Sequence, residues 1–351
     1  MLGQKIPAFD HIGGTIMIHN PIFKGFNPDP CICRKGDDYY IAVSTFEWMP
    51  GIPVYHSKDM KNWELYTHVL TDDEEVDLKK LPSAKGIWAP CLTYCEQEDL
   101  FYVVYGVMNS MNARYFDVDN FVITAKDIRG PWSKPVYLHS AGFDASMLHD
   151  DDGRKWVVSL EWETREGYEK PGAICMVEYS PEKKEVIGYP KRIWNGGTDR
   201  GCIEAPHLTK RNGYYYIFAP AGGVQTGWQM EARSKNIYGP YEHKVVLHQG
   251  NSVINGPHQG GWVDTESGED WFIHFQDLNM YGRVTHLQPA KWVNDWLEIG
   301  VDNNKDNIGE PVLEYKKPEL DKSEKLYPLD SDNFTGNKLG LQWQFQAHFT
   351  K

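Results

Sequence analysis

Three acidic residues each lie in a short motif ahead of an aromatic-rich segment. They are Asp29 in Asn27-Pro28-Asp29-Pro30, Asp144 in Phe143-Asp144-Ala145-Ser146 and Glu204 in Ile203-Glu204-Ala205-Pro206. Carboxylates that are brought together repel each other, so at least one of them should have a raised pKa and keep its proton near neutral pH. A carboxylic acid beside an ionised carboxylate supplies the general acid and base that hydrolysis of a glycosidic bond requires. Taken singly, each residue would more simply cap a turn.

Five similar segments of aromatic and β-branched residues must position these acids. Each is a predicted strand after an acidic or glycine turn, and the five lie roughly 60 residues apart, at 37–43, 99–104, 153–158, 213–218 and 269–274. A second element, a strand end followed by a tight turn and a returning strand, recurs at 57–63, 125–132 and 234–241. Five units of this length, with about four strands each, predict an all-β, five-bladed β-propeller. The alternative is an irregular β-sandwich whose spacing is coincidental.

The repeat also predicts that the acids meet. About ten residues before each aromatic segment the chain carries, in order, Asp29, Trp88, Asp144, Glu204 and His258. Because the first strand of each propeller blade lines the central channel, residues at equivalent positions converge on one end of one axis. The sequence therefore predicts three carboxyl groups and an imidazole in one pocket.

Composition limits the classes of partner. The 351 residues are 41% hydrophobic and 24% charged, as in a globular protein, and the net charge of −13 argues against nucleic acid and anionic membranes as partners. No run of 18 apolar residues is present, so no transmembrane helix is expected. Aromatic residues make up 13% of the chain, which suits both strands and a sugar-binding surface.

The cysteines and the N-terminus bear on the compartment. None of the six cysteines forms a C-x-x-C pair, so we expect buried free thiols and no structural zinc site; they are Cys31, Cys33, Cys91, Cys95, Cys175 and Cys202. Residues 1–16 have no basic segment followed by an apolar one and are interpreted as a leader or an added segment. We therefore expect a cytoplasmic location.

The composition changes toward the C-terminus. Residues 17–313 hold the five repeats, and the charged stretch that follows suggests a linker over 314–329. Residues 330–351 are too few for a domain and are interpreted as the start of a truncated C-terminal β-sandwich, with a strand at 339–345.

With these residues assembled, the chain resembles glycoside hydrolase family 43, in the branch of the β-xylosidases and α-L-arabinofuranosidases. The resemblance covers about residues 20–310, in the expected order. The matching stretches are 20–30, 39–48, 55–59, Gly86-Ile87-Trp88-Ala89-Pro90, 143–146, 203–207, and Gly282-Arg283 with Leu287-Gln288-Pro289.

The resemblance implies a separate role for each acid. Asp29 would be the general base that deprotonates water, and Glu204 the general acid that protonates the departing oxygen. Asp144 would hold Glu204 in place and raise its pKa. The implied mechanism is a single displacement that inverts the anomeric carbon, on a xylo- or arabinoxylo-oligosaccharide substrate.

The resemblance also implies sugar-binding residues. Arg283 matches the family's substrate-binding arginine, whose forked donors suit two hydroxyl groups. Phe46 and Trp88 match the hydrophobic walls around the terminal sugar, and Trp48 is a further candidate. The alternatives are a surface salt bridge for Arg283 and buried core packing for the aromatic residues.

His258 matches a channel histidine that binds Ca2+ in many members of the family, with water completing the shell. One imidazole is an unusual calcium ligand, because calcium prefers oxygen. The alternative is a histidine that is hydrogen-bonded in the channel. Asp302, Asn304 and Asp306 resemble a calcium loop only superficially, and a solvated turn is the favoured interpretation.

One segment departs from the family's best-known xylosidases. They carry a Gly-Gly-Thr segment ending in His-Ala, whereas this chain has Gly222-Gly223-Val224-Gln225-Thr226-Gly227-Trp228-Gln229. The sequence therefore leaves xylose and arabinose open, and both activities in one site are plausible. The rival functions are a retaining fructosidase, a non-catalytic sugar-binding propeller and a protein-binding scaffold. A homo-oligomer is compatible with the sequence.

Overall fold

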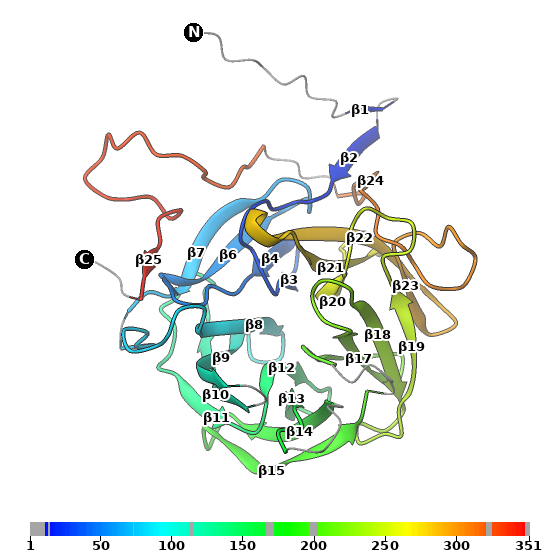
Figure 1. The fold of residues 1–351 in the computed structure, drawn as a ribbon, viewed down its shortest axis with the longest axis horizontal. Helices are drawn as coiled ribbons and strands as arrows, with labels where there is room; N and C mark the ends of the chain where they lie inside the picture. Colours follow the sequence, from blue (N-terminus) through cyan, green and yellow to red (C-terminus); the bar gives the residue numbers. More distant parts are fainter. Residues whose placement is uncertain are drawn as a thin grey trace.

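The computed structural model describes residues 11–12, 15–72, 74–112, 115–165, 172–196, 203–320 and 325–347, and the regular secondary structure of these residues is β-strand apart from one 3-10 helix. Five four-stranded antiparallel sheets of these residues surround a central axis (Figure 1). The predicted five-bladed β-propeller is confirmed. Within the described residues, no helix is both long enough and apolar enough to cross a membrane.

Each blade takes its four strands in nearly consecutive order. Blade 1 contains β3 (Cys31–Lys35), β4 (Asp38–Ala42), β6 (Gly51–Ser57) and β7 (Glu64–Leu70). Blade 2 contains β8 (Gly86–Cys95), β9 (Leu100–Asn112), β10 (Tyr115–Ala125) and β11 (Val136–His139). Blade 3 contains β12 (Phe143–His149), β13 (Lys155–Glu161), β14 (Ala173–Ser180) and β15 (Glu185–Trp194).

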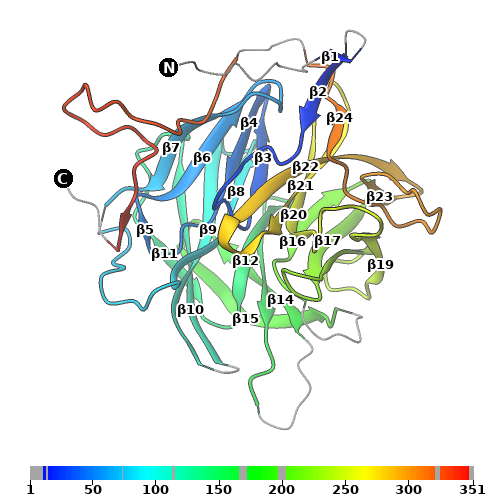
Figure 2. The ribbon, with the colours of Figure 1, turned by 45° about the horizontal axis from the view of Figure 1, so that its top comes forward.

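Blades 4 and 5 close the ring. Blade 4 contains β16 (His207–Arg211), β17 (Tyr214–Ala221), β18 (Trp228–Ser234) and β19 (Glu242–Leu247). Blade 5 contains β20 (His258–Asp264), β21 (Asp270–Asp277), β22 (Arg283–Val293) and β23 (Trp296–Ile299), with the 3-10 turn η1 (Asn279–Tyr281) before β22. The first strands β3, β8, β12, β16 and β20 lie innermost (Figure 2), and β20 contacts β3 to complete the circle.

The repeated aromatic segments are the second strands of their blades. Each blade is covered by a neighbour on both sides, so both faces of its second strand are buried, and the usual alternation of apolar and polar residues is lost. In β4, for example, Tyr39, Tyr40 and Ile41 are all buried. This packing explains why the repeat appears in the sequence as continuous apolar runs.

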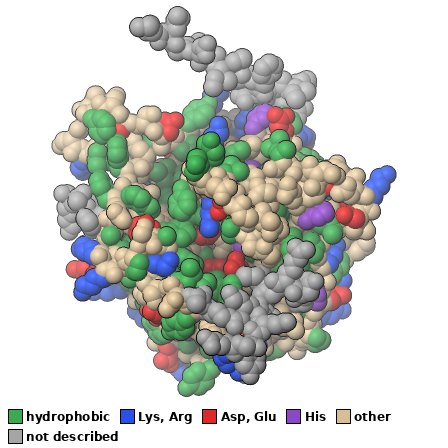
Figure 3. Space-filling view, viewed as in Figure 1, with side chains coloured by type: hydrophobic (Ala, Val, Ile, Leu, Met, Phe, Trp, Pro, Cys, Tyr) green, Lys and Arg blue, Asp and Glu red, His purple; other side chains and the backbone are tan. Residues whose placement is uncertain are grey.

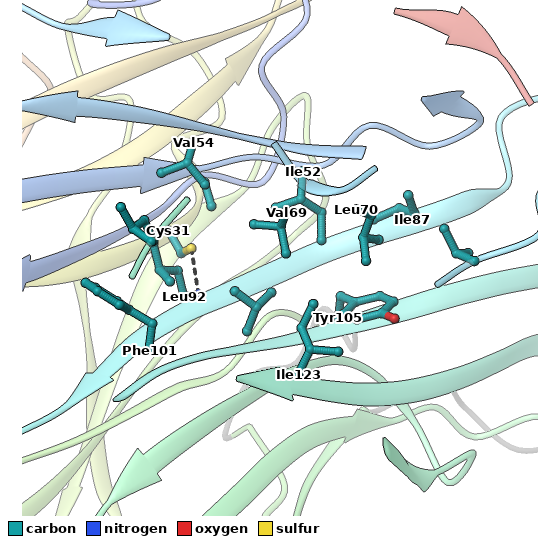
Figure 4. Packing of buried hydrophobic residues seen from close by; sticks show 14 of the residues in the cluster. Cys31, Ile52, Val54, Val69, Leu70, Ile87, Leu92, Phe101, Tyr105 and Ile123 are labelled. Carbon is teal, nitrogen blue, oxygen red and sulfur yellow. Dashed lines mark hydrogen bonds between the residues drawn. The ribbon is translucent and has the colours of Figure 1, made fainter. Parts of the chain in front are cut away.

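The core lies between the blades rather than in one centre. Figure 4 shows the cluster between blades 1 and 2, where Val54 and Val69 pack in the same cluster as Ile87, Phe101 and Tyr105. Full burial of one such side chain contributes about 1.5–3 kcal/mol. These interfaces hold the first strands, and the residues that precede them, in fixed positions around the axis.

Three segments lie outside the blades. β1 (His11–Ile12), β2 (Thr15–His19) and β24 (Glu314–Lys316) form a small sheet in which β2 pairs with β24, so the residues expected as a linker begin with a strand. β25 (Phe345–Gln346) pairs with β5 (Trp48–Met49) of the propeller. The strand predicted over 339–345 is wrong, because only its last residue is extended.

The five cysteines that the structure describes are buried and form no disulfide. Cys202 lies outside the described residues.

Candidate active site

In every blade, one residue with a left-handed backbone lies just before the first strand or within its first four residues. These residues are Asp29 (φ 54°), Ala89 (φ 40°), Asp144 (φ 54°), Ala205 (φ 39°) and Gln259 (φ 41°). A positive φ is uncommon for a residue other than glycine and is costly unless the surrounding structure enforces it. Because this backbone conformation recurs near the start of the first strand in all five blades, we regard it as a structural feature of this end of the channel.

This geometry corrects the predicted alignment of the site residues. Asp29 and Asp144 occupy the left-handed position, whereas Trp88, Glu204 and His258 each lie one residue before it. Consecutive side chains of a regular strand point to opposite faces, but the left-handed residue interrupts that alternation. The ladders of β8, β12 and β20 shift register at this point. The site is therefore built from two successive positions of the blade repeat, the left-handed residue and the residue before it.

Asp29 is a buried carboxyl group, 7% exposed, that blades 1 and 2 hold together. The Ser44 hydroxyl donates to its Oδ2 at 2.6 Å and itself accepts from the Ala89 backbone N–H at 2.7 Å. Burial raises the pKa of Asp29, and the Arg283 charge and the Ser44 hydrogen bond oppose that rise. Asp29 therefore combines increased basicity with fixed orientation.

Asp144 lies on the opposite side of the channel end and is also 7% exposed. Burial raises its pKa well above the usual value, and the charges of Glu204 and Asp29 raise it further. The Gln259 amide donates to its Oδ2 at 2.9 Å. The expected consequence of crowding these acids, a carboxyl group with a raised pKa, is thus found at Asp144.

Glu204 and His258 meet between blades 4 and 5. Glu204 has a side chain that is 19% exposed, and its Oε2 lies 3.4 Å from Nε2 of the fully buried His258. Burial, and then the Arg283 charge, lowers the pKa of His258 to about 3, so its ring is neutral. The Glu204 backbone N–H donates to the Pro220 carbonyl at 3.0 Å, which fixes the start of the side chain.

Arg283 reaches the Asp29 carboxyl group from the start of β22. Its Nη1 lies 3.6 Å from Asp29 Oδ1, its Nε donates to Asp277 Oδ2 at 3.1 Å, and its guanidinium lies over the Phe275 ring at 5.1 Å. The predicted site residue is therefore not in a surface salt bridge. Figure 3 shows acidic side chains in the hollow at the centre of this face, with a basic side chain beside them.

Aromatic side chains form one wall beside the carboxyl groups. The ring centroids of Phe46 and Trp88 are 5.5 Å apart, those of Phe26 and Phe46 are 5.4 Å apart, and those of Trp88 and Phe116 are 6.4 Å apart. Phe46 and Trp88 are both only partly buried. They are therefore available to a ligand, as an apolar surface on which a sugar ring can stack.

Trp48 is placed differently. It is 41% exposed in β5, and it lines a cavity with Asn27, Tyr55 and the segment around Leu329 to Gln344. The same cavity is lined by Phe26, which packs against Phe46, and by Ser44, which bonds Asp29. Trp48 therefore stays a candidate for binding a sugar beside the site.

Sequence reasoning missed four residues of this site. Gln259 had a usable signal, because it follows His258 and occupies the position equivalent to Asp29 and Asp144. Ser44, Asp277 and Phe116 follow no repeat, and their contacts depend on how neighbouring blades and loops pack. No pattern in the chain marks them.

The described residues offer little for a metal ion beyond His258. Its two ring nitrogens are buried without a hydrogen-bond partner, as a ligand of a cation would be. No group of three His, Cys, Asp or Glu side chains in the described part of the chain is arranged to hold a metal. Asp302 accepts instead from the backbone N–H groups of Asp306 and Asn307, as expected for a turn.

Several known proteins are similar to this chain in sequence and fold. The chain matches the model of Glycosyl hydrolases family 43 over residues 18–297. It is 40% identical over 299 residues to Xylosidase/arabinosidase 43B of Humicola insolens, which covers 80% of this chain and 55% of that protein. It is 37% identical over 339 residues to Beta-xylosidase of Bacillus subtilis (strain 168), which covers 88% of this chain and 62% of that protein.

A solved structure extends the likeness. The crystal structure of xylan beta-1,4-xylosidase from Bacillus Halodurans C-125 has a TM-score of 0.86 and 38% identity, and the match covers 94% of this chain and 64% of that chain. The present chain spans between 55% and 62% of the length of the two curated relatives.

Proposed function

Because the chain belongs to glycosyl hydrolases family 43, we propose that it is an inverting, exo-acting glycoside hydrolase that releases xylose from the non-reducing end of xylo-oligosaccharides. The observation that carries the proposal is the gathering of Asp29, Asp144 and Glu204 at one end of the propeller channel, with Arg283 and an aromatic wall beside them. A propeller that only bound sugar would not need three acids so close that two of them raise the pKa of the third.

Asp29 acts as the general base in this proposal. A water molecule attacks the anomeric carbon and gives its proton to Asp29, while the bond from that carbon to the glycosidic oxygen breaks. The raised pKa of the buried Asp29 favours proton uptake, and Arg283 and Ser44 keep its carboxylate oriented.

Glu204 acts as the general acid and gives its proton to the departing oxygen. Asp144 lies close enough for its charge state to respond to Glu204. A protonated Asp144 spares Glu204 a second neighbouring negative charge, and an ionised Asp144 favours the protonated form of Glu204. Asp144 thus positions and tunes the acid without contacting the bond that breaks.

The sugar preference rests on a small pocket. Arg283 can hold hydroxyl groups through its forked donors, and Phe46 with Trp88 can cover the ring of the terminal sugar. The relatives are named for β-xylosidase or for both xylosidase and arabinosidase activity. An α-L-arabinofuranosidase, or one site with both activities, is therefore the second candidate.

Aryl β-D-xylosides and aryl α-L-arabinofuranosides test this proposal. We expect faster release from the xylosides, and we expect proton NMR to show α-xylose as the first product, because one displacement inverts the anomeric carbon. β-Xylose as the first product would overturn the inverting mechanism. Binding of xylo-oligosaccharide without turnover would favour a non-catalytic propeller.

We also propose that His258 holds a calcium ion. The neutral imidazole has two buried ring nitrogens without a hydrogen-bond partner. Water would complete the shell, since no group of three potential ligand side chains is arranged around a metal in the described residues. Such a cation would offset the repulsion among the carboxylates and lower their pKa values.

Removal of divalent ions tests His258. A chelator should lower the melting temperature and kcat/KM of the wild-type chain, and added Ca2+ should restore both. His258→Gln should start from the lower values and respond to neither treatment, because the ligand is gone. A wild-type chain that keeps its melting temperature and activity in the chelator would refute the proposal.

A further inference from the structure

The backbone of the 222–229 segment, where the chain departs from the best-known xylosidases, is fixed against blade 5. The Asn255 side-chain amide donates to the Gln225 carbonyl at 3.0 Å, and Gln276 donates to Asn255 Oδ1 at 2.7 Å. A Cβ atom at Gly256 would lie 2.5 Å from the Val224 carbonyl oxygen, so glycine permits the close approach of the two loops. This contact places the Gln225 side chain over the start of β22.

The Gln225 side chain holds a carboxylate behind the substrate-binding arginine. Its Nε2 donates to Asp277 Oδ1 at 2.9 Å, and the Asn279 backbone N–H donates to the same oxygen at 2.8 Å. The other oxygen, Oδ2, accepts from Arg283 Nε at 3.1 Å. Three donors thus fix both oxygens of Asp277, whose side chain is 15% exposed.

Asp277 in turn decides where the guanidinium of Arg283 points. Because the guanidinium is a rigid plane, a hydrogen bond at Nε sets the direction of its two Nη groups. One face of that plane rests on the Phe275 ring, and Nη1 lies 3.6 Å from Asp29 Oδ1. The chain Gln225–Asp277–Arg283 therefore runs from an exposed loop to the proposed base.

We propose that Gln225 and Asp277 are positioning residues that set the angle of the Arg283 fork and thereby the choice between sugars. This inference rests on the proposed function, because it concerns how that site grips its substrate. Xylopyranose and arabinofuranose present their hydroxyl groups from a six-membered and a five-membered ring. If the Arg283 guanidinium rotates, its hydrogen bonds to the hydroxyl groups of one ring weaken more than those to the other.

Four variants test the inference on the aryl xyloside and the aryl arabinofuranoside. Gln225→Ala should lower kcat/KM for the preferred sugar by about threefold to tenfold, mainly through KM, which is the effect of one lost hydrogen bond. Asp277→Asn should lower it by about tenfold to a hundredfold, because the fork loses its charged partner. Both should change the ratio of the two activities. Thr226→Ala, a neighbour whose hydroxyl bonds only to Gly222 of the same loop, is the matched control.

The fourth variant combines Gln225→Ala with Asp277→Asn. If Gln225 acts through Asp277, its removal should have little further effect once Asp277 has been changed. If the losses in kcat/KM of the two single variants simply add in the double variant, Gln225 does not act through Asp277, and the inference is overturned. Kinetics of Gln225→Ala that match those of Thr226→Ala would overturn it as well, and so would a loss that follows a fall in melting temperature. A wild-type chain that hydrolyses neither glycoside would instead refute the proposed function.

Discussion

Asp29→Asn should lower kcat for aryl β-xylosides by roughly a thousandfold, because an amide cannot take the proton of the attacking water. Asn keeps the size of Asp29 and can still accept from Ser44, whose hydroxyl lies 2.6 Å from Asp29 Oδ2. KM should change much less than kcat, since the sugar contacts remain. Asp152→Asn is the matched control, because Asp152 is exposed and pairs only with Arg154 in a turn. Near-normal turnover by Asp29→Asn would remove Asp29 as the base.

The dependence of kcat/KM on pH is a second test of Asp29 as the general base. Asp29 works only when it is ionised, and burial raises its pKa from the usual 3.8. The value of kcat/KM should therefore fall as the pH drops through a value above 3.8. The fall at higher pH, where the general acid Glu204 loses its proton, is a separate limb. Arg283→Gln should move this acid limb to higher pH, because the Arg283 charge lowers the pKa of Asp29. If the acid limb lies at the same pH in the wild-type chain and in Arg283→Gln, the general base is a residue other than Asp29.

The fold could be predicted because the packing of the blades requires a recurring pattern of apolar residues in the sequence. Each second strand is covered on both faces, so Tyr39 to Ile41 and its four counterparts appear as apolar runs at one period. The period then places the residues ahead of the first strands on one axis. For the same reason, the gathering of Asp29, Asp144 and Glu204 could be predicted without any contact being visible in the sequence.

The rest depends on features that have no linear signature. The left-handed residue in each blade decides that Glu204 and Asp144 occupy successive positions rather than equivalent ones, and alanine fills that position as readily as aspartate. Asp277 and Ser44 act through loops and hydroxyl groups that resemble any turn. The pairing of Trp48 with β25, which places residues of the C-terminal segment in the same cavity, has no signal in the sequence either.

Glu204→Gln should separate substrates by the quality of their leaving groups. Xylobiose, whose leaving sugar needs a proton, should lose kcat/KM by roughly a thousandfold to ten-thousandfold, because Gln cannot donate that proton as an acid does. A dinitrophenyl xyloside leaves as a stable anion and should lose far less. Since the Glu204 backbone is fixed by Pro220 and its Oε2 lies beside His258, the isosteric amide should fit the same space.

The pattern of loss across substrates separates an acid from a residue that only shapes the pocket. A shaping residue would slow xylobiose and the dinitrophenyl xyloside equally, whereas the loss of an acid makes the rate depend steeply on the pKa of the leaving group. Glu298→Gln is the matched control, because Glu298 pairs with the exposed Lys291 at the outer edge of blade 5, away from the channel. Asp144→Asn should show an intermediate dependence, because it removes the carboxyl group whose charge state is coupled to that of Glu204 and leaves the acid in place. Near-normal hydrolysis of xylobiose by Glu204→Gln would assign the proton to another group. Asp144, whose pKa is raised well above its usual value, would then be the acid to test.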